Sequence, residues 1–185
     1  MSETKKKKRR AYLDSFRKNE EGNYDYTGNL YQYNGGSHGL RRSLIKLWGL
    51  CAVLMGSLIA AGCISAPGMD NCFYVLLPYA AALMAGVSVF WALCRMTSGK
   101  NPLKEYVYEA SVGKLPERTV MTVAFDAAAI IGEAVYICLH GMGGKQVGFG
   151  VFVLLDFAAA GAALVLRREI MRMSWTKHNK PDKTQ

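Results

Sequence analysis

The stretch Thr119–His140, TVMTVAFDAAAIIGEAVYICLH, combines the length of a membrane span with three ionisable side chains. A helix rises about 1.5 Å per residue, so this segment would extend about 30 Å, the thickness of the hydrocarbon core of a bilayer. Asp126, Glu133 and His140 nevertheless recur within it at intervals of seven. The stretch therefore predicts a transmembrane helix whose ionisable groups need an explanation of their own.

Three further apolar stretches of similar length lie at residues 40–64, 73–96 and 147–166. A bilayer core offers no water to unpaired backbone groups, so each spanning segment must satisfy its own backbone as a helix. Short connections after the first and third of these spans force neighbouring helices together. The sequence predicts an all-α integral membrane protein with an antiparallel four-helix transmembrane bundle over residues 40–166, whose third span is 119–140.

The positive charge is distributed unevenly along the chain. Of 23 Lys and Arg residues, 11 lie before or at Lys46, five between Arg95 and Arg118, and six from Arg167 onward, which leaves Lys145 alone on the other side. By the positive-inside rule, both termini are expected in the cytoplasm, which places the chain in a bacterial cytoplasmic membrane. The net charge of +9 then indicates attraction to anionic lipid headgroups, and we expect no nucleic-acid partner.

The N-terminal segment, residues 1–39, is basic and rich in tyrosine. Its stretch YDYTGNLYQY predicts a short β-hairpin that turns at Thr27–Asn29 and places its tyrosines on one face. The alternative is a mostly disordered tail whose aromatic rings lie at the level of the lipid headgroups. These aromatic residues, which are candidates for contact with a partner, are Tyr24, Tyr26, Tyr31 and Tyr33.

Two other polar segments are expected on the same side of the membrane, the loop 97–118 and the basic tail 167–185. Within the loop, Leu103–Val112 is compatible with a short amphipathic helix. Pro116 is expected to break the chain before the third span. Together with the N-terminal segment, the loop and the tail could form a small platform to which a partner binds.

The ionisable residues of the third span form a stripe, because seven residues return a helix to within about 20° of the same direction. A carboxylate facing lipid near the bilayer centre costs about 3 kcal/mol, so the stripe is expected to face other helices. Glu133 and Asp156 of the fourth span lie at similar depth, where two carboxylates cannot both remain charged easily. Arg95 is the expected partner of Asp126, and His140 is expected in the outer interface.

Two interpretations of the stripe remain open. In the first, Glu133 and Asp156 form a proton or cation site, with Asp126 and His140 as stations on a pathway. In the second, which we favour, the acids are protonated or paired groups that hydrogen-bond the bundle together or dock it against another membrane subunit.

The cysteines suggest one structural feature. Cys63 and Cys72 flank the short outer loop, where a disulfide bond between them is compatible with an oxidising compartment. Cys51, Cys94 and Cys138 fall inside predicted spans as small apolar residues.

The sequence carries no catalytic motif that we recognise, and its three histidines fall in different environments. We therefore expect no enzyme, no catalytic residues, no metal site and no cofactor. The favoured function is that of an accessory or interaction subunit of a membrane complex, with another membrane subunit or further copies of the chain as partners. The alternative is a small proton- or cation-coupled transporter that uses Glu133 and Asp156.

Overall fold

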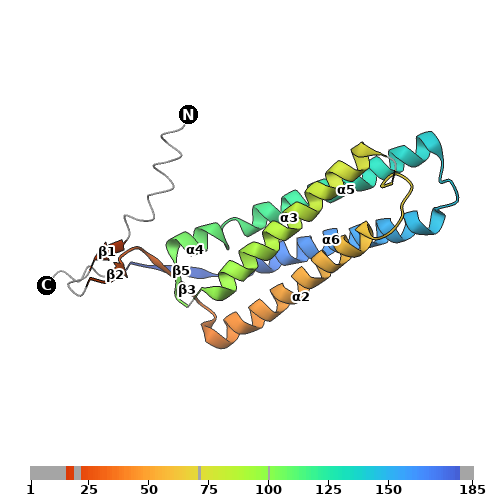
Figure 1. The fold of residues 1–185 in the computed structure, drawn as a ribbon. Helices are drawn as coiled ribbons and strands as arrows, with labels where there is room; N and C mark the ends of the chain where they lie inside the picture. Colours follow the sequence, from red (N-terminus) through yellow and green to blue (C-terminus); the bar gives the residue numbers. More distant parts are fainter. Residues whose placement is uncertain (1–15, 19–21, 71, 100, 180–185) are drawn as a thin grey trace.

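A computed structural model of the chain describes residues 16–18, 22–70, 72–99 and 101–179 and is dominated by long helices (Figure 1). Four of the described helices are long and apolar enough to cross a membrane. They are α2 (Gly36–Gly62), α3 (Phe73–Ser98), α5 (Leu115–His140) and α6 (Gln146–Arg172). The helical content and the four long helices agree with the fold predicted from the sequence.

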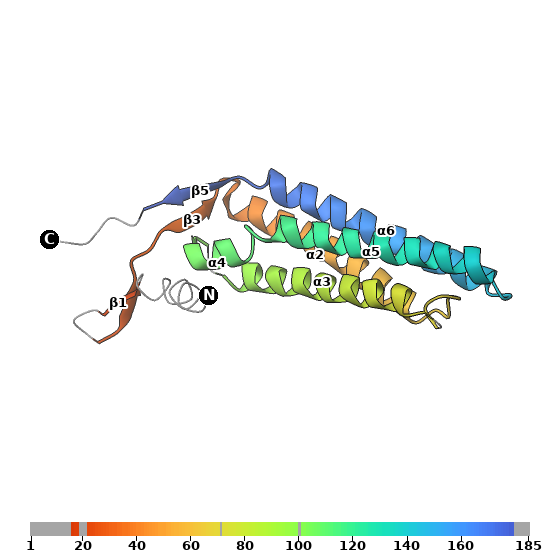
Figure 2. The same cartoon turned by 90° about the horizontal axis from the view of Figure 1, so that it is seen from above.

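The four helices form an elongated antiparallel bundle in which each helix has two neighbours (Figures 1 and 2). Helix α2 packs against α6 and α3, and α5 packs against α3 and α6. Leucine side chains such as Leu47, Leu54 and Leu58 of α2 are fully buried between the helices. Large apolar side chains including Trp91 and Phe157 point outward and are 67% and 63% exposed. An outer surface with so many exposed apolar side chains suits a protein that is surrounded by lipid.

The helices are longer than the apolar stretches predicted to cross a membrane. Helix α6 continues to Arg172, and α5 begins at Leu115, so that Pro116 lies in its first turn. The expectation that Pro116 breaks the chain before the helix was wrong. Proline is compatible with the first helical turn because the N–H groups there have no intrahelical acceptor.

One contact brings the backbones of α3 and α5 close together. Pro78 within α3 has no N–H, so the carbonyl of Tyr74, four residues earlier, lacks its helical partner. Gly132 of α5 faces that carbonyl, and a Cβ added at Gly132 would lie 3.0 Å from the Tyr74 oxygen. Glycine therefore allows this close approach of the two backbones, whereas Gly161 of α6 has open space beside it.

A three-stranded antiparallel sheet joins parts of the chain that are far apart in sequence. Its central strand β3 (Leu30–Tyr33) pairs with β4 (Leu103–Lys104) on one side and with β5 (Trp175–His178) on the other. A short helix, α4 (Glu105–Ala110), follows β4 directly. Figures 1 and 2 show the sheet and α4 at one end of the bundle, here called the sheet end. The α2–α3 and α5–α6 connections lie at the opposite end, here called the loop end.

The predicted hairpin between the two tyrosine-rich strands was wrong in its pairing. Strand β2 (Tyr24–Tyr26) instead pairs with β1 (Phe16–Lys18), with Phe16 opposite Tyr26. The three residues after β2 do not turn back, and the Asn29 carbonyl accepts a hydrogen bond of 3.1 Å from the N–H of Glu105. Strand β3 thereby gains two neighbouring strands, which a local hairpin would not provide. The sequence-distant partners thus outcompete the local turn.

Candidate functional site

Three acidic side chains of the bundle are buried, as the predicted stripe required. Asp126, Glu133 and Asp156 are each at most 1% exposed. His140 lies at the end of α5, is exposed, and stacks on the ring of Tyr136 with a centroid distance of 4.7 Å. The acids therefore face the other helices, and the histidine lies at the surface of the loop end.

Asp156 of α6 belongs to the same buried group of acids as Asp126 and Glu133 of α5. Both of these α5 acids act electrostatically on Asp156. None of the four carboxyl oxygens of Asp126 and Asp156 has a hydrogen-bond partner of normal geometry among the described residues. Burial of carboxyl groups without hydrogen-bond donors is costly, so these two acids are an unusual feature of the bundle core. The expected proximity of Asp156 and Glu133 remains a prediction, and Asp126 joins them as a third buried acid.

Glu133 is occupied by the α2–α3 connection. Its Oε1 accepts a hydrogen bond of 2.9 Å from the backbone N–H of Gly68. Residues 66–68 are buried between the helix ends, and a Cβ at Gly68 would collide with the other carboxylate oxygen of Glu133. Glu133 therefore fixes a loop that folds back into the bundle.

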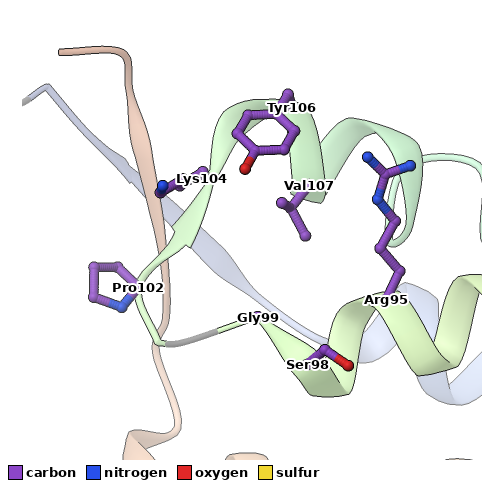
Figure 3. Close-up of a pocket in the computed structure, with 7 residues that line it drawn as sticks. All are labelled: Arg95, Ser98, Gly99, Pro102, Lys104, Tyr106 and Val107. Atoms are coloured by element: carbon purple, nitrogen blue, oxygen red, sulfur yellow. The ribbon is translucent and has the colours of Figure 1, made fainter. Parts of the chain in front are cut away.

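Arg95 is not the partner of Asp126. Its side chain is exposed at the sheet end of α3, where it lines a pocket together with residues of the following loop and of α4 (Figure 3). Asp126 accepts no hydrogen bond from any described residue. The prediction was wrong because Asp126 faces the centre of the bundle, whereas Arg95 faces outward.

The loop end is held by a second polar contact. Lys145 Nζ lies 2.5 Å from Asp70 Oδ2 and donates a hydrogen bond of 2.8 Å to Ser65 Oγ. The hydrogen bonds from Lys145 and from Ser65 lower the pKa of Asp70 below its ordinary value. Lys145, the only basic residue expected on this side, thus connects the beginning of α6 to the α2–α3 connection.

The cysteines at the loop end are free thiols. Cys63 is exposed and Cys72 is half-buried, and no disulfide joins them in the structure. The predicted bridge is therefore not formed here. Cys51 is buried as expected, whereas Cys138 is exposed on the outer surface of α5.

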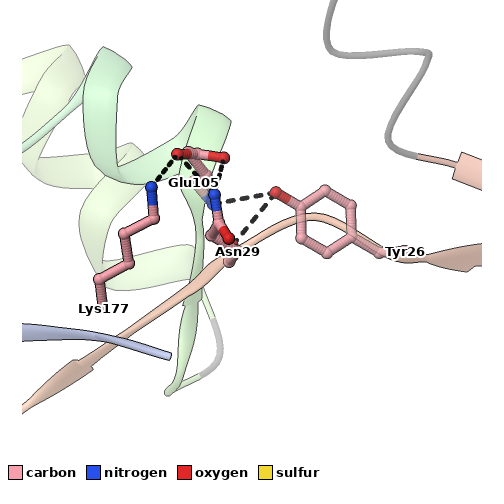
Figure 4. Close-up of polar contacts among 4 residues, drawn as sticks. All are labelled: Tyr26, Asn29, Glu105 and Lys177. Carbon is pink, nitrogen blue, oxygen red and sulfur yellow. Dashed lines mark hydrogen bonds and ion pairs between the residues drawn. The ribbon is translucent and has the colours of Figure 1, made fainter. Parts of the chain in front are cut away.

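At the sheet end, a polar network joins the three segments outside the bundle (Figure 4). Asn29 Nδ2 donates to both carboxylate oxygens of Glu105, at 3.0 and 2.9 Å, and Lys177 Nζ lies 3.3 Å from Glu105 Oε1. The N–H of Glu105 donates to the Tyr26 hydroxyl oxygen at 3.2 Å. One carboxylate thus binds groups from the N-terminal segment and the C-terminal tail.

Aromatic rings reinforce these connections. Tyr31 of β3 stacks on Tyr108 of α4, with ring centroids 4.0 Å apart and an interplanar angle of 2°. Trp175 of β5 makes edge contacts with both Tyr33 and Tyr108. The three polar segments therefore form one folded unit, called here the platform, which consists of β3, β4, β5 and α4. The predicted gathering of these segments is confirmed.

The four candidate tyrosines differ in their surroundings. Tyr26 is buried against Phe16 and Tyr106, and Tyr31 and Tyr33 pack within the platform. Tyr24 is 73% exposed. The tyrosines therefore do not share one face, and Tyr24 alone of the four offers most of its ring to a partner.

Several residues of these sites escaped the sequence analysis. Asn29, Glu105 and Lys177 carry no local signal, because their partners lie more than 70 residues away in the chain. Gly68 lies in the predicted outer loop between Cys63 and Cys72, and its burial leaves no signal in the sequence. The acids could be found in advance, since charge within an apolar stretch is visible in the sequence.

Comparisons with protein-family models, with curated proteins and with solved structures find no match to this chain. Among the described residues, no three His, Cys, Asp or Glu side chains are grouped in a way that could hold a metal ion. The geometry of the chain itself is therefore the basis for its proposed function.

Proposed function

We propose that the chain is a multi-pass protein of a bacterial cytoplasmic membrane, with the platform and both termini in the cytoplasm. The four long apolar helices and their outward-facing apolar side chains support insertion. The orientation is supported by the basic residues, because those that the structure describes, Lys145 excepted, belong to segments at the sheet end.

Within that membrane, the chain acts as an accessory or interaction subunit. The platform is the observation that supports this role. A loop that only connected two helices would not need a sheet assembled from three distant segments and fastened by the network at Glu105. Such an ordered surface at the membrane boundary suits the binding of another protein.

The partner is expected to present acidic residues. The segments that form and flank the platform carry most of the basic residues of the chain. Charge complementarity accelerates encounter and selects among partners. Tyr24, exposed beside the platform, supplies an aromatic contact of the type enriched at interfaces.

Native mass spectrometry tests this function on tagged protein extracted gently from its own membrane. We expect a second protein in stoichiometric amount with the wild type, less of it with Tyr24→Ala, and an unchanged amount with Tyr74→Ala. Tyr74 is the matched control because it is also exposed but lies at the loop end. A homo-oligomer without any second protein would contradict the accessory role.

The pair of Asp126 and Asp156 favours a second candidate, proton- or cation-coupled transport. Buried acids in membrane helices commonly mark ion pathways, and these two accept no hydrogen bond from other described residues. Asp156→Asn should then abolish proton-coupled flux in liposomes, while Glu117→Gln, at an exposed site on α5, should leave it unchanged. Equal flux in the wild type and the Asp156→Asn variant would exclude this candidate.

A further inference from the structure

A pocket of about 590 Å³ lies at the sheet end between the end of α3 and α4 (Figure 3). It is lined by Arg95, Ser98, Gly99, Pro102, Lys104, Tyr106 and Val107. We propose that this pocket binds the phosphate headgroup of an anionic phospholipid from the surrounding bilayer.

The charge of the pocket suits an anion. Figure 3 shows Arg95 and Lys104 on opposite sides, and none of the described residues that line the pocket is acidic. The nearby carboxylate of Glu105 is occupied by Asn29 and Lys177. Arg95 makes no hydrogen bond or ion pair with any described residue, so its guanidinium is available to bind phosphate in a bidentate manner.

Lys104 is positioned by aromatic contacts. Its Nζ lies 5.4 Å from the ring centre of Phe16 and 5.3 Å from that of Tyr26. These cation–π contacts use the ring faces and leave the ammonium donors available. The cation is thus held at the pocket without being neutralised by a carboxylate.

The depth of the pocket matches that of lipid headgroups. Tryptophan is enriched at the boundary between acyl chains and headgroups, and Trp91 is 67% exposed on α3. Arg95 follows on the same face of the helix, about 6 Å closer to the sheet end. Trp48 of α2 lies at a similar level, since its Nε1 donates to Thr97 Oγ1 at 3.0 Å.

The lining also distinguishes this pocket from a general basic surface. Val107 lies between the two cations, and Pro102 lines the pocket beyond Lys104, so both supply apolar contacts of the kind that the glycerol end of a lipid would require. A second hollow, near Arg167, Arg168 and Arg172, is lined by α6 alone. The pocket at Arg95, in contrast, combines α3, the following loop and α4 around one space. Basic pockets at this level of a membrane protein commonly bind anionic headgroups.

The test uses full-length protein in vesicles of phosphatidylcholine that contain a minor fraction of phosphatidylglycerol, followed by native mass spectrometry. We expect the wild type to retain one phosphatidylglycerol per chain. Each cation near a membrane surface contributes a factor of about five, so Arg95→Gln should weaken retention about five-fold and Arg95→Gln/Lys104→Gln about 25-fold. Arg41→Gln/Arg42→Gln, which removes two exposed cations elsewhere at the sheet end, should leave it unchanged.

A second measurement uses the wild type alone, so that the result does not depend on the folding of a variant. A photoactivatable phosphatidylglycerol should crosslink to the peptide that contains residues 101–110. Crosslinking distributed equally over the basic segments, or equal loss in the two double variants, would overturn the proposal. Displacement of the lipid by millimolar inorganic phosphate would overturn it as well, because the site would then bind a soluble phosphate.

Discussion

Glu133 shows how a single buried carboxylate is stabilised inside an apolar bundle. It is fully buried, yet one oxygen accepts the Gly68 N–H at 2.9 Å. Backbone donors from the α2–α3 connection thus replace the water that the carboxyl group loses. Asp126 and Asp156 receive no such donor from the described residues. Glu133 therefore has a structural role that these two acids do not share.

We expect Glu133→Ala to destabilise the bundle. The Gly68 N–H would remain buried without an acceptor, at a cost of about 1–3 kcal/mol in the free energy of unfolding. Glu133→Gln retains an amide oxygen as acceptor and should lose less. Denaturation in detergent micelles measures both, with Glu117→Ala at an exposed site of the same helix as the control. Equal stability of Glu133→Ala and the control would contradict this role.

The contact of Asp70 with Lys145 predicts a response to acid at the loop end. Hydrogen bonds from Lys145 and Ser65 lower the pKa of Asp70 in the folded chain. The contact therefore stabilises the docked loop fully above the ordinary pKa of about 4 and is lost as the pH falls through the lowered pKa. Hydrogen exchange at residues 66–70, corrected for intrinsic rates, should show protection decreasing below about pH 4.

Asp70→Asn serves as the control for that measurement, because asparagine does not titrate. Its protection should be lower than that of the wild type at pH 6 and should vary less with acid. Identical pH profiles for the two proteins would show that Asp70 is not responsible.

At the scale of the elements, α3 and α5 approach each other closely where Gly132 faces the Tyr74 carbonyl, which Pro78 leaves without its helical hydrogen bond. Gly132→Ala places a methyl group 3.0 Å from the Tyr74 carbonyl oxygen and 3.4 Å from the side chain of Val75. The helices must then separate, and we expect a loss of about 1–3 kcal/mol in the free energy of unfolding. Gly161→Ala, with open space beside it, should be neutral or slightly stabilising. Unfolding in micelles compares the two, and equal stabilities would show that the contact is loose.

The platform is held together in part by the polar contacts of Glu105. Glu105→Ala removes the acceptor of two hydrogen bonds from Asn29 and the partner of Lys177. We expect faster hydrogen exchange in β3 and β5 with no change in the helices. Glu109→Ala, exposed on the same short helix, is the matched control. Unchanged exchange in both strands would assign the stability of the platform to its aromatic contacts instead.

For the whole molecule, the proposed function depends on the side of the membrane on which the platform lies. In a background with Cys63, Cys72 and Cys138 replaced by serine, a membrane-impermeant maleimide should label Lys145→Cys in intact cells. Thr176→Cys in β5 should be labelled only after the membrane is permeabilised. The opposite pattern would place the platform outside the cell and exclude a cytoplasmic partner.

The predictable part of this molecule is the part governed by local chemistry. Apolar stretches long enough to span a bilayer identified all four helices, and the charges within them identified the buried acids. The partners of those acids were not predictable, because the α2–α3 connection folds inward to Glu133, whose acceptor role therefore depends on a segment 65 residues away in the chain. Similar depth along two helices does not fix the direction in which each side chain points.

The same reasoning explains the error in the N-terminal segment. Tyr24 and Tyr31 lie in alternating patterns around a glycine, which locally favours a hairpin. The pairing was decided instead by strands β4 and β5, whose residues follow the second and fourth long helices. A contact between segments so distant leaves no periodic signal in a single sequence.

The position of β5 has a consequence for biosynthesis. Strand β3 precedes all four long helices, and β5 follows the last of them. During translation, β3 must therefore wait without its β5 neighbour until α6 has emerged and β5 can return to it. The sheet is therefore completed only after all four long helices have been made, and a partner that recognises the completed sheet would select chains that contain the whole bundle.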